Sequence, residues 1–71
     1  MIKYRLTQGT YITVIGRFDD YYNRHYDEGT EFIKVSGGKG HVILMADGKR
    51  HYASRDTLKK YFEIIIDLVK I

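Results

Sequence analysis

The sequence predicts an all-β domain with one short helical turn before the final strand. Asp47-Gly48 lies between two runs of strand-forming residues and favours a two-residue type I′ turn, because both central residues need a positive φ. Residues 2–7 alternate strictly between apolar and polar side chains, as in a half-buried strand. Residues 10–15 are mainly β-branched and aromatic, which also favours a strand.

The length and composition of the chain limit its class. Its 71 residues are enough for one domain, which we assign to residues 1–71. Because it has no cysteine, disulfides and cysteine-based zinc sites are excluded. No cleavable apolar leader follows Met1, and no run approaches the ~20 apolar residues that span a bilayer. We therefore expect a cytoplasmic protein that does not associate with membranes.

The remaining elements follow from local signals. Gly16 permits a bend after the second strand, residues 30–35 form a third strand, and residues 36–40 form a glycine-rich turn before the hairpin. Ser54 is placed to cap a helical turn over residues 55–62. Residues 63–71 are predicted as a final strand, because three consecutive isoleucines disfavour a helix. A helical stripe of apolar residues leaves a helix to the end of the chain as the alternative.

The turn fixes the register of the predicted hairpin: Ala46 pairs with Lys49, Met45 with Arg50, Leu44 with His51, and Ile43 with Tyr52. One face, predicted to be the core, carries Val42, Leu44, Ala46, Lys49, His51 and Ala53. The other carries His41, Ile43, Met45, Arg50, Tyr52 and Ser54. This mixture of apolar and basic groups suits contact with a second layer, a subunit or a ligand, or the covered outer face of a small barrel. A one-residue slip would exchange the two faces.

Residues 19–29 form the longest polar segment and show neither helical nor strand periodicity over their full length. We predict a loop there, and connections of this length are often functional. Its tyrosines offer large contact areas with polar tips, so we predict a partner-binding loop containing Tyr21, Tyr22, Arg24 and Tyr26. The alternative is that two of the tyrosines cap an open end of the core.

The predicted order of elements resembles that of SH3-like barrels. Residues 33–44 are similar to the KOW motif of that fold, with Gly37, Gly40 and Val42 carrying the pattern. KOW domains bind RNA, DNA or the transcription and translation machinery, so the resemblance implies a binding module rather than an enzyme. The compact chain, and in particular its segment 52–62, also resembles small accessory proteins encoded by tailed phages.

No motif for catalysis, metal binding or cofactor binding is present in the sequence. The three histidines form no ligand-spaced cluster, and the acidic residues between 19 and 28 lack the spacing of an EF-hand loop. Residues 36–40 lack the spacing of a phosphate-binding Walker loop. We therefore expect no catalytic site, no metal and no cofactor.

Positive charge is concentrated in the second half of the chain. Residues 34–60 contain seven basic and two acidic residues, whereas residues 17–28 contain two basic and four acidic residues. A basic region of this kind suits a polyanion. We predict binding to nucleic acid, or to a nucleic-acid-handling complex, through Lys39, Lys49, Arg50, Tyr52 and Arg55. Two alternatives are a protein-interaction module or inhibitor that uses residues 19–29, and a homo-oligomer formed through Ile43, Met45 and an unpaired final strand.

Overall fold

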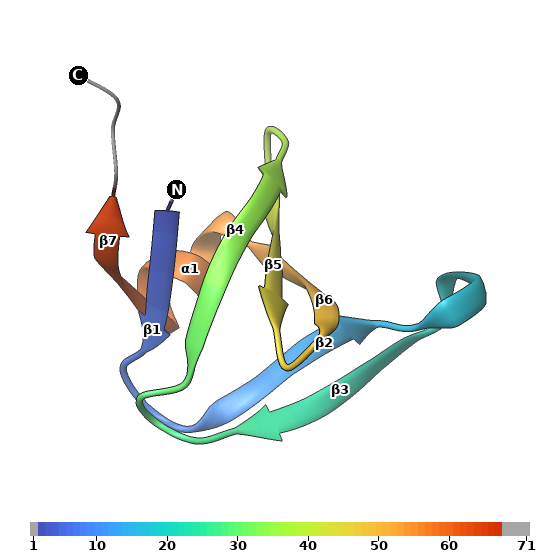
Figure 1. Cartoon of the computed structure of the whole chain (residues 1–71), viewed down its shortest axis with the longest axis horizontal. Helices are drawn as coiled ribbons and strands as arrows, with labels where there is room; N and C mark the ends of the chain where they lie inside the picture. Colours follow the sequence, from blue (N-terminus) through green and yellow to red (C-terminus); the bar gives the residue numbers. More distant parts are fainter. Residues whose placement is uncertain (1, 68–71) are drawn as a thin grey trace.

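The computed structural model describes residues 2–67, apart from the side chains of residues 19, 66 and 67. Its elements in chain order are β1 (Ile2–Leu6), β2 (Thr10–Ile15), η1 (Arg17–Asp19), β3 (Tyr21–Tyr26), β4 (Glu31–Gly37), β5 (His41–Ala46), β6 (Lys49–Ser54), α1 (Arg55–Tyr61) and β7 (Phe62–Asp67). The prediction of an all-β domain with one short helix before the final strand is confirmed (Figure 1).

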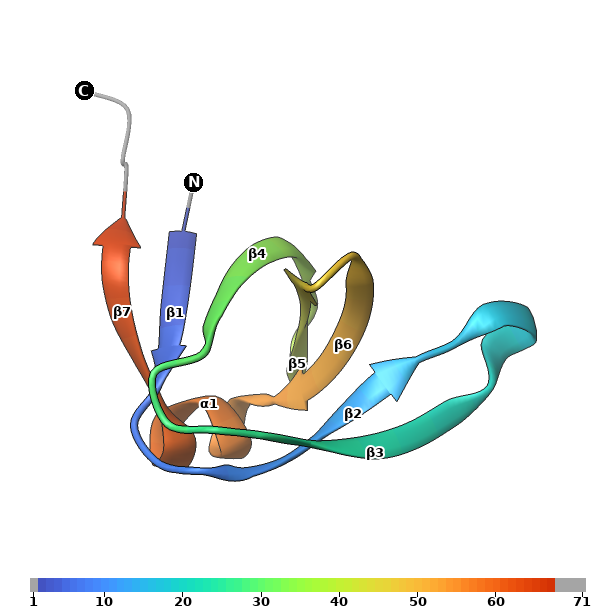
Figure 2. The ribbon, with the colours of Figure 1, turned by 60° about the horizontal axis from the view of Figure 1, so that its bottom comes forward.

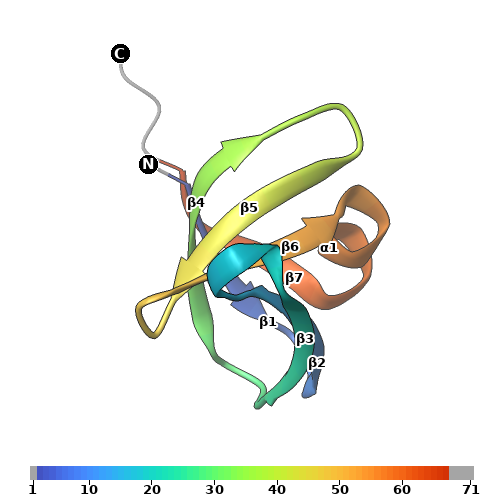
Figure 3. The same ribbon diagram turned by 90° about the vertical axis from the view of Figure 1, so that its right-hand side faces the viewer.

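All seven strands belong to one antiparallel sheet, in the order β3-β2-β6-β5-β4-β1-β7. The sheet curls strongly, as Figure 3 shows from the side of the β2–β3 hairpin. Within the described residues its edge strands β3 and β7 do not pair with each other, so the sheet is open and does not close into a barrel. The prediction of a small barrel is corrected in this respect. The N-terminal strand and β7 lie side by side at one edge (Figure 2).

The β5–β6 hairpin has the predicted turn and register. Asp47 and Gly48 have φ values of 55° and 71°, as a type I′ turn requires. All four predicted pairs, from Ala46 with Lys49 to Ile43 with Tyr52, are observed. The predicted core face is also largely confirmed, because Val42, Leu44, His51 and Ala53 are buried, whereas Lys49 is exposed.

The prediction of a loop over residues 19–29 is wrong, because residues 21–26 form strand β3. This strand pairs with β2 along its whole length, from Thr10–Tyr26 to Ile15–Tyr21. Together they form a long hairpin that projects from the rest of the sheet (Figure 1). Both faces of this edge strand are mostly exposed, so its sequence has no need of the apolar alternation that reveals a half-buried strand.

The tip of the β2–β3 hairpin contains the η1 turn. Gly16 N–H donates to the carbonyl of Asp20 over 2.6 Å and closes this turn, so the bend predicted at Gly16 is present. Phe18 has a φ of 58° and is 91% exposed. A bulky side chain in this left-handed conformation is unusual.

The core is aromatic at its centre. Phe32 of β4 is fully buried and contacts three rings edge to face, those of Tyr26, His51 and Phe62, at centroid distances of 5.2–5.4 Å. Such arrangements contribute about 0.5–1.5 kcal/mol each beyond the burial of area. Aliphatic side chains from three strands, β1, β2 and β5, complete the core, namely Leu6, Ile12, Val14, Val42 and Leu44.

The helix α1 begins at Arg55 as predicted and ends at Tyr61, one residue before the predicted end, because Phe62 begins β7. The Ser54 hydroxyl accepts a hydrogen bond from Thr57 N–H at 3.1 Å, so Ser54 is the N-cap. The chain then enters β7, as predicted, and residues 68–71 of the predicted final strand lie outside the described residues. No helix within residues 2–67 is long and apolar enough to cross a membrane.

Candidate nucleic-acid interface

The outer face of the sheet carries a cluster of apolar, aromatic and basic side chains. The strand pairing places these side chains in two rows, of which the first runs across β3, β2, β6 and β5 and the second lies on β6 and β5. We call this cluster the outer-face patch, and its members are Ile15, Tyr21, Ile43, Met45, Arg50 and Tyr52. Tyr21 and Tyr52 are 67% and 42% exposed, respectively, so both rings are open to a ligand.

Tyr52 is held in place by His41. The two rings stack with a centroid distance of 5.1 Å and an interplanar angle of 23°. The imidazole is itself packed against the glycine-rich turn, since a Cβ added at Gly38 would lie 2.9 Å from Cε1 of His41. The Tyr52 ring is therefore supported on one side by a close-packed group.

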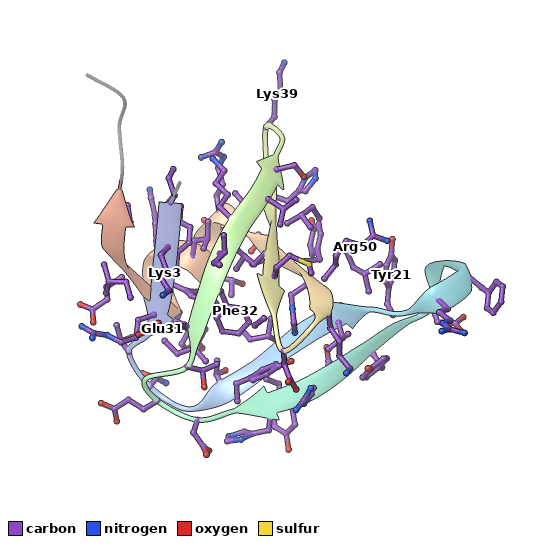
Figure 4. The ribbon with its side chains drawn as sticks, viewed as in Figure 1. Lys3, Tyr21, Glu31, Phe32, Lys39 and Arg50 are labelled. Atoms are coloured by element: carbon purple, nitrogen blue, oxygen red, sulfur yellow. The ribbon has the colours of Figure 1, made fainter. Side chains whose placement is uncertain are left out.

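Arg50 differs from the other cations on the outer face of the sheet. Lys3 forms an ion pair with Glu31 at 2.9 Å, and Arg5 pairs with Glu63 at 2.7 Å. Among the side chains that the structure describes, no carboxylate lies within ion-pair distance of Arg50. Its guanidinium projects on the same side of the sheet as the Tyr21 ring (Figure 4).

A groove of about 790 Å³ lies between the tips of the β2–β3 and β5–β6 hairpins. Three cations line it, those of Arg17, Lys49 and Arg50, together with one carboxylate, that of Asp20. Ile15 and Met45 of the outer-face patch also line the groove, so the patch and the groove are continuous. The combined surface is positive at the groove, and Ile43 and Tyr52 lie farther along the strands from it.

The structure divides the predicted nucleic-acid site into two groups. Lys49 and Arg50 lie at the turn end of the β5–β6 hairpin, with Tyr52 farther along β6 on the face of Arg50. Lys39 is at the tip of the β4–β5 turn (Figure 4) and Arg55 begins α1, both at the opposite end of the hairpin. Five residue steps along a strand separate these ends, which is about 17 Å.

Arg55 forms hydrogen bonds to the glycine-rich turn at its end of the hairpin. Its Nε donates to the carbonyl of Lys39 at 2.8 Å, and its Nη2 donates to that of Gly38 at 3.0 Å. Its backbone N–H also donates to the carbonyl of Gly40. These three bonds fix the glycine-rich turn against the start of α1.

The four residues predicted as a partner-binding loop have different environments in β3. Tyr21 and Tyr22 are exposed, whereas Tyr26 is buried in the core, so the prediction of one open tyrosine loop is corrected. Arg24 forms an ion pair with Asp47 at 3.0 Å and lies over the Tyr26 ring at 4.9 Å. It therefore ties the projecting hairpin to the β5–β6 turn.

The features on which the homo-oligomer alternative depended, exposed apolar side chains and an unpaired final strand, differ in the structure. Ile43 and Met45 are half-buried rather than fully exposed, and β7 pairs with β1 along one side. The other side of β7 remains an edge of the sheet.

Sequence reasoning missed Ile15 and Arg17 as members of the candidate surface. Ile15 lies in a correctly predicted strand, and the alternation there places it on the face opposite to buried Val14. Its pairing with Arg50 depends on the contact between β2 and β6, which are far apart in the chain. The sequence carries no local signal for that pairing.

Proteins of known family or structure offer no guide to this surface. The chain matched no protein-family model, no curated protein and no solved structure with which it was compared.

Proposed function

We propose that this chain is a non-catalytic binding module whose outer-face patch and adjoining groove bind nucleic acid. The observation that carries the proposal is the environment of Arg50, a cation without a carboxylate partner among the described side chains, between Ile15 and Met45 on neighbouring strands. The exposed rings of Tyr21 and Tyr52 lie on the same face. Nucleic acids present both of the matching chemistries, phosphate for the cations and bases for the rings.

The charge distribution supports this choice of ligand. The groove brings three cations together with one carboxylate, so it favours an anion. Lys49 and Arg50 extend from the short β5–β6 turn, which leaves them accessible to a phosphate backbone. A purely apolar partner would leave these charges without compensation.

The test is the affinity of the purified chain for labelled oligonucleotides at low salt, measured by fluorescence anisotropy. Replacing Lys49 and Arg50 with alanine should weaken binding and should flatten the log–log dependence on salt by about 1.4–1.8 units, since each phosphate contact contributes about −0.7 to −0.9. Lys39→Ala is the matched control, because it removes a cation at the other end of the hairpin. If the intact chain binds neither DNA nor RNA at low salt, the proposal is wrong.

Protein binding is the second candidate, and one observation favours it. β3 is an edge strand, so one side of its backbone has no neighbouring strand within the described residues, and Tyr21 and Tyr22 beside it are exposed. Such an edge can accept an extended segment of a partner. Affinity capture from lysate with and without nuclease separates the candidates, since a partner retained after nuclease treatment supports this second one.

A further inference from the structure

We infer that the preferred ligand is a single strand, with bases stacked on Tyr52 and Tyr21 and its phosphates along the groove cations; this inference rests on the proposed function. The first reason is the chemistry at the centre of the patch. Ile15 pairs with Tyr21 and Ile43 pairs with Tyr52, so each ring has an apolar neighbour, and apolar groups make no favourable contact with phosphate. In a duplex the flat faces of the bases are covered by their neighbours, whereas unpaired bases expose them to aromatic side chains.

The second reason is the arrangement of charge around the patch. Three cations for which the described side chains offer no carboxylate partner, those of Arg17, Lys49 and Arg50, line the groove at one end of the patch, whereas Lys39 lies at the other end of the hairpin. On the side of β4 and β1, the outer-face cations Lys3 and Arg5 are neutralised by Glu31 and Glu63. The surface therefore has positive charge for one phosphate backbone and has little for the second backbone of a duplex.

The third reason is the order of the stacking platform. His41 supports one side of the Tyr52 ring, and the Gly38 backbone supports His41. A ring that is fixed before binding loses little conformational entropy when a base stacks on it. Tyr21 lies two strands away across the sheet, about 10 Å from the line of β6, with Ile15 between them. The two rings are thus positioned to contact different bases of one strand.

The test compares a single-stranded oligonucleotide of about 12 nucleotides, a length within the site sizes of small β domains, with the duplex formed from it and its complement. We expect at least about tenfold tighter binding of the single strand, with a salt slope of roughly −2 for three phosphate contacts. Tyr52→Ala and Tyr21→Ala should each weaken single-strand binding about 5- to 100-fold with little change in this slope. Tyr52→Phe keeps the ring and should bind as the original chain does.

Tyr11→Ala is the matched control, because Tyr11 is 66% exposed on the outer face of β2 but lies outside the patch, against His25. It should change the affinity less than twofold, and thermal melts check that each variant is folded. Equal or tighter binding of the duplex overturns the single-strand inference and leaves the proposed function standing. Single-strand binding that survives both tyrosine-to-alanine changes overturns the stacking role. Absence of binding to either form contradicts the proposed function itself.

Discussion

The Tyr26 hydroxyl and Nε2 of His51 form a hydrogen bond inside the core, with a separation of 2.5 Å. The carbonyl of Leu44 lies 3.3 Å from Nδ1 of the same ring, and because a carbonyl only accepts, the ring proton belongs on Nδ1. Nε2 of the neutral ring is then the acceptor and the tyrosine is the donor. This pair joins β3 to β6 without any charge in the core.

The stability of the fold should decrease in mild acid because of this histidine. Burial lowers the pKa of His51 below its ordinary value of 6.5. As the pH falls through 6.5, His51 becomes protonated in the unfolded chain but stays neutral in the folded chain. The free energy of unfolding therefore falls by up to about 1.4 kcal/mol per pH unit until the folded-state pKa is reached. Urea titrations between about pH 7.5 and 5 measure this slope. His51→Gln should remove the part of this pH slope that His51 causes, whereas His41→Gln should leave that part unchanged.

Removing the tyrosine hydroxyl should destabilise the protein. Tyr26→Phe leaves Nε2 of the fully buried His51 ring without a donor, and an unsatisfied buried acceptor costs about 1–3 kcal/mol. Tyr22→Phe is the matched control on the same strand and the same face, because Tyr22 is exposed and the change should lie within about 0.5 kcal/mol. Equal stability of the two variants by chemical denaturation would contradict the role assigned to the Tyr26–His51 bond.

The type I′ turn gives a further prediction. Gly48 has a φ of 71°, and valine in the left-handed region costs at least about 1–2 kcal/mol. Gly48→Val should therefore lower the Tm by roughly 4–8 °C for each kcal/mol lost. Gly40→Val is the control, because a Cβ there also meets open space while the φ lies outside the left-handed region. A Gly48→Val variant that melts with the original chain would rule out the turn conformation.

Arg55 should prove to be a structural residue of the glycine-rich turn. Arg55→Met removes the guanidinium bonds to the carbonyls of Gly38 and Lys39, each worth about 0.5–1.5 kcal/mol or more. The amides of residues 38–40 should then exchange with solvent faster, as followed by NMR. Lys59→Met removes a charge from the same helix without touching the turn and should leave those amides unchanged. Unaltered exchange in Arg55→Met would show that these bonds do not order the turn.

The sequence predicted best those elements whose signals are local. Asp47-Gly48 is a specific turn signal. Once the turn is placed at these two residues, the residue pairs and the buried face of β5 and β6 follow. Ser54 similarly identified the start of α1. In both cases a few adjacent residues determine the backbone, so no knowledge of distant contacts is required.

Strand β3 and the curled, open sheet could not be predicted in this way. The alternation in residues 21–26 is hidden because Tyr22 and Arg24 are polar or amphipathic on the inner face, where only Tyr26 is buried. The candidate site depends on the pairing of β2 with β6, which brings Ile15 beside Arg50. Such pairings are set by the packing of the whole chain. For the same reason, the basic residues that were predicted to form one site lie in two groups at opposite ends of the β5–β6 hairpin.

Under the proposed function, the short ladder between β2 and β6 couples ligand binding to the position of the β2–β3 hairpin. Within residues 2–67, the β2–β3 hairpin joins the rest of the sheet through one ladder of three pairs, Thr13–Tyr52, Val14–His51 and Ile15–Arg50. Opening of the hairpin breaks this ladder together with the Arg24–Asp47 ion pair and the Tyr26–His51 hydrogen bond, and local opening of this kind costs no more free energy than global unfolding. Tyr21 lies on one side of this ladder and Arg50 and Tyr52 lie on the other, so a ligand that contacts all three binds only the closed form. Its apparent affinity then scales with the closed fraction, and a substitution that tightens the ladder raises affinity without touching the ligand.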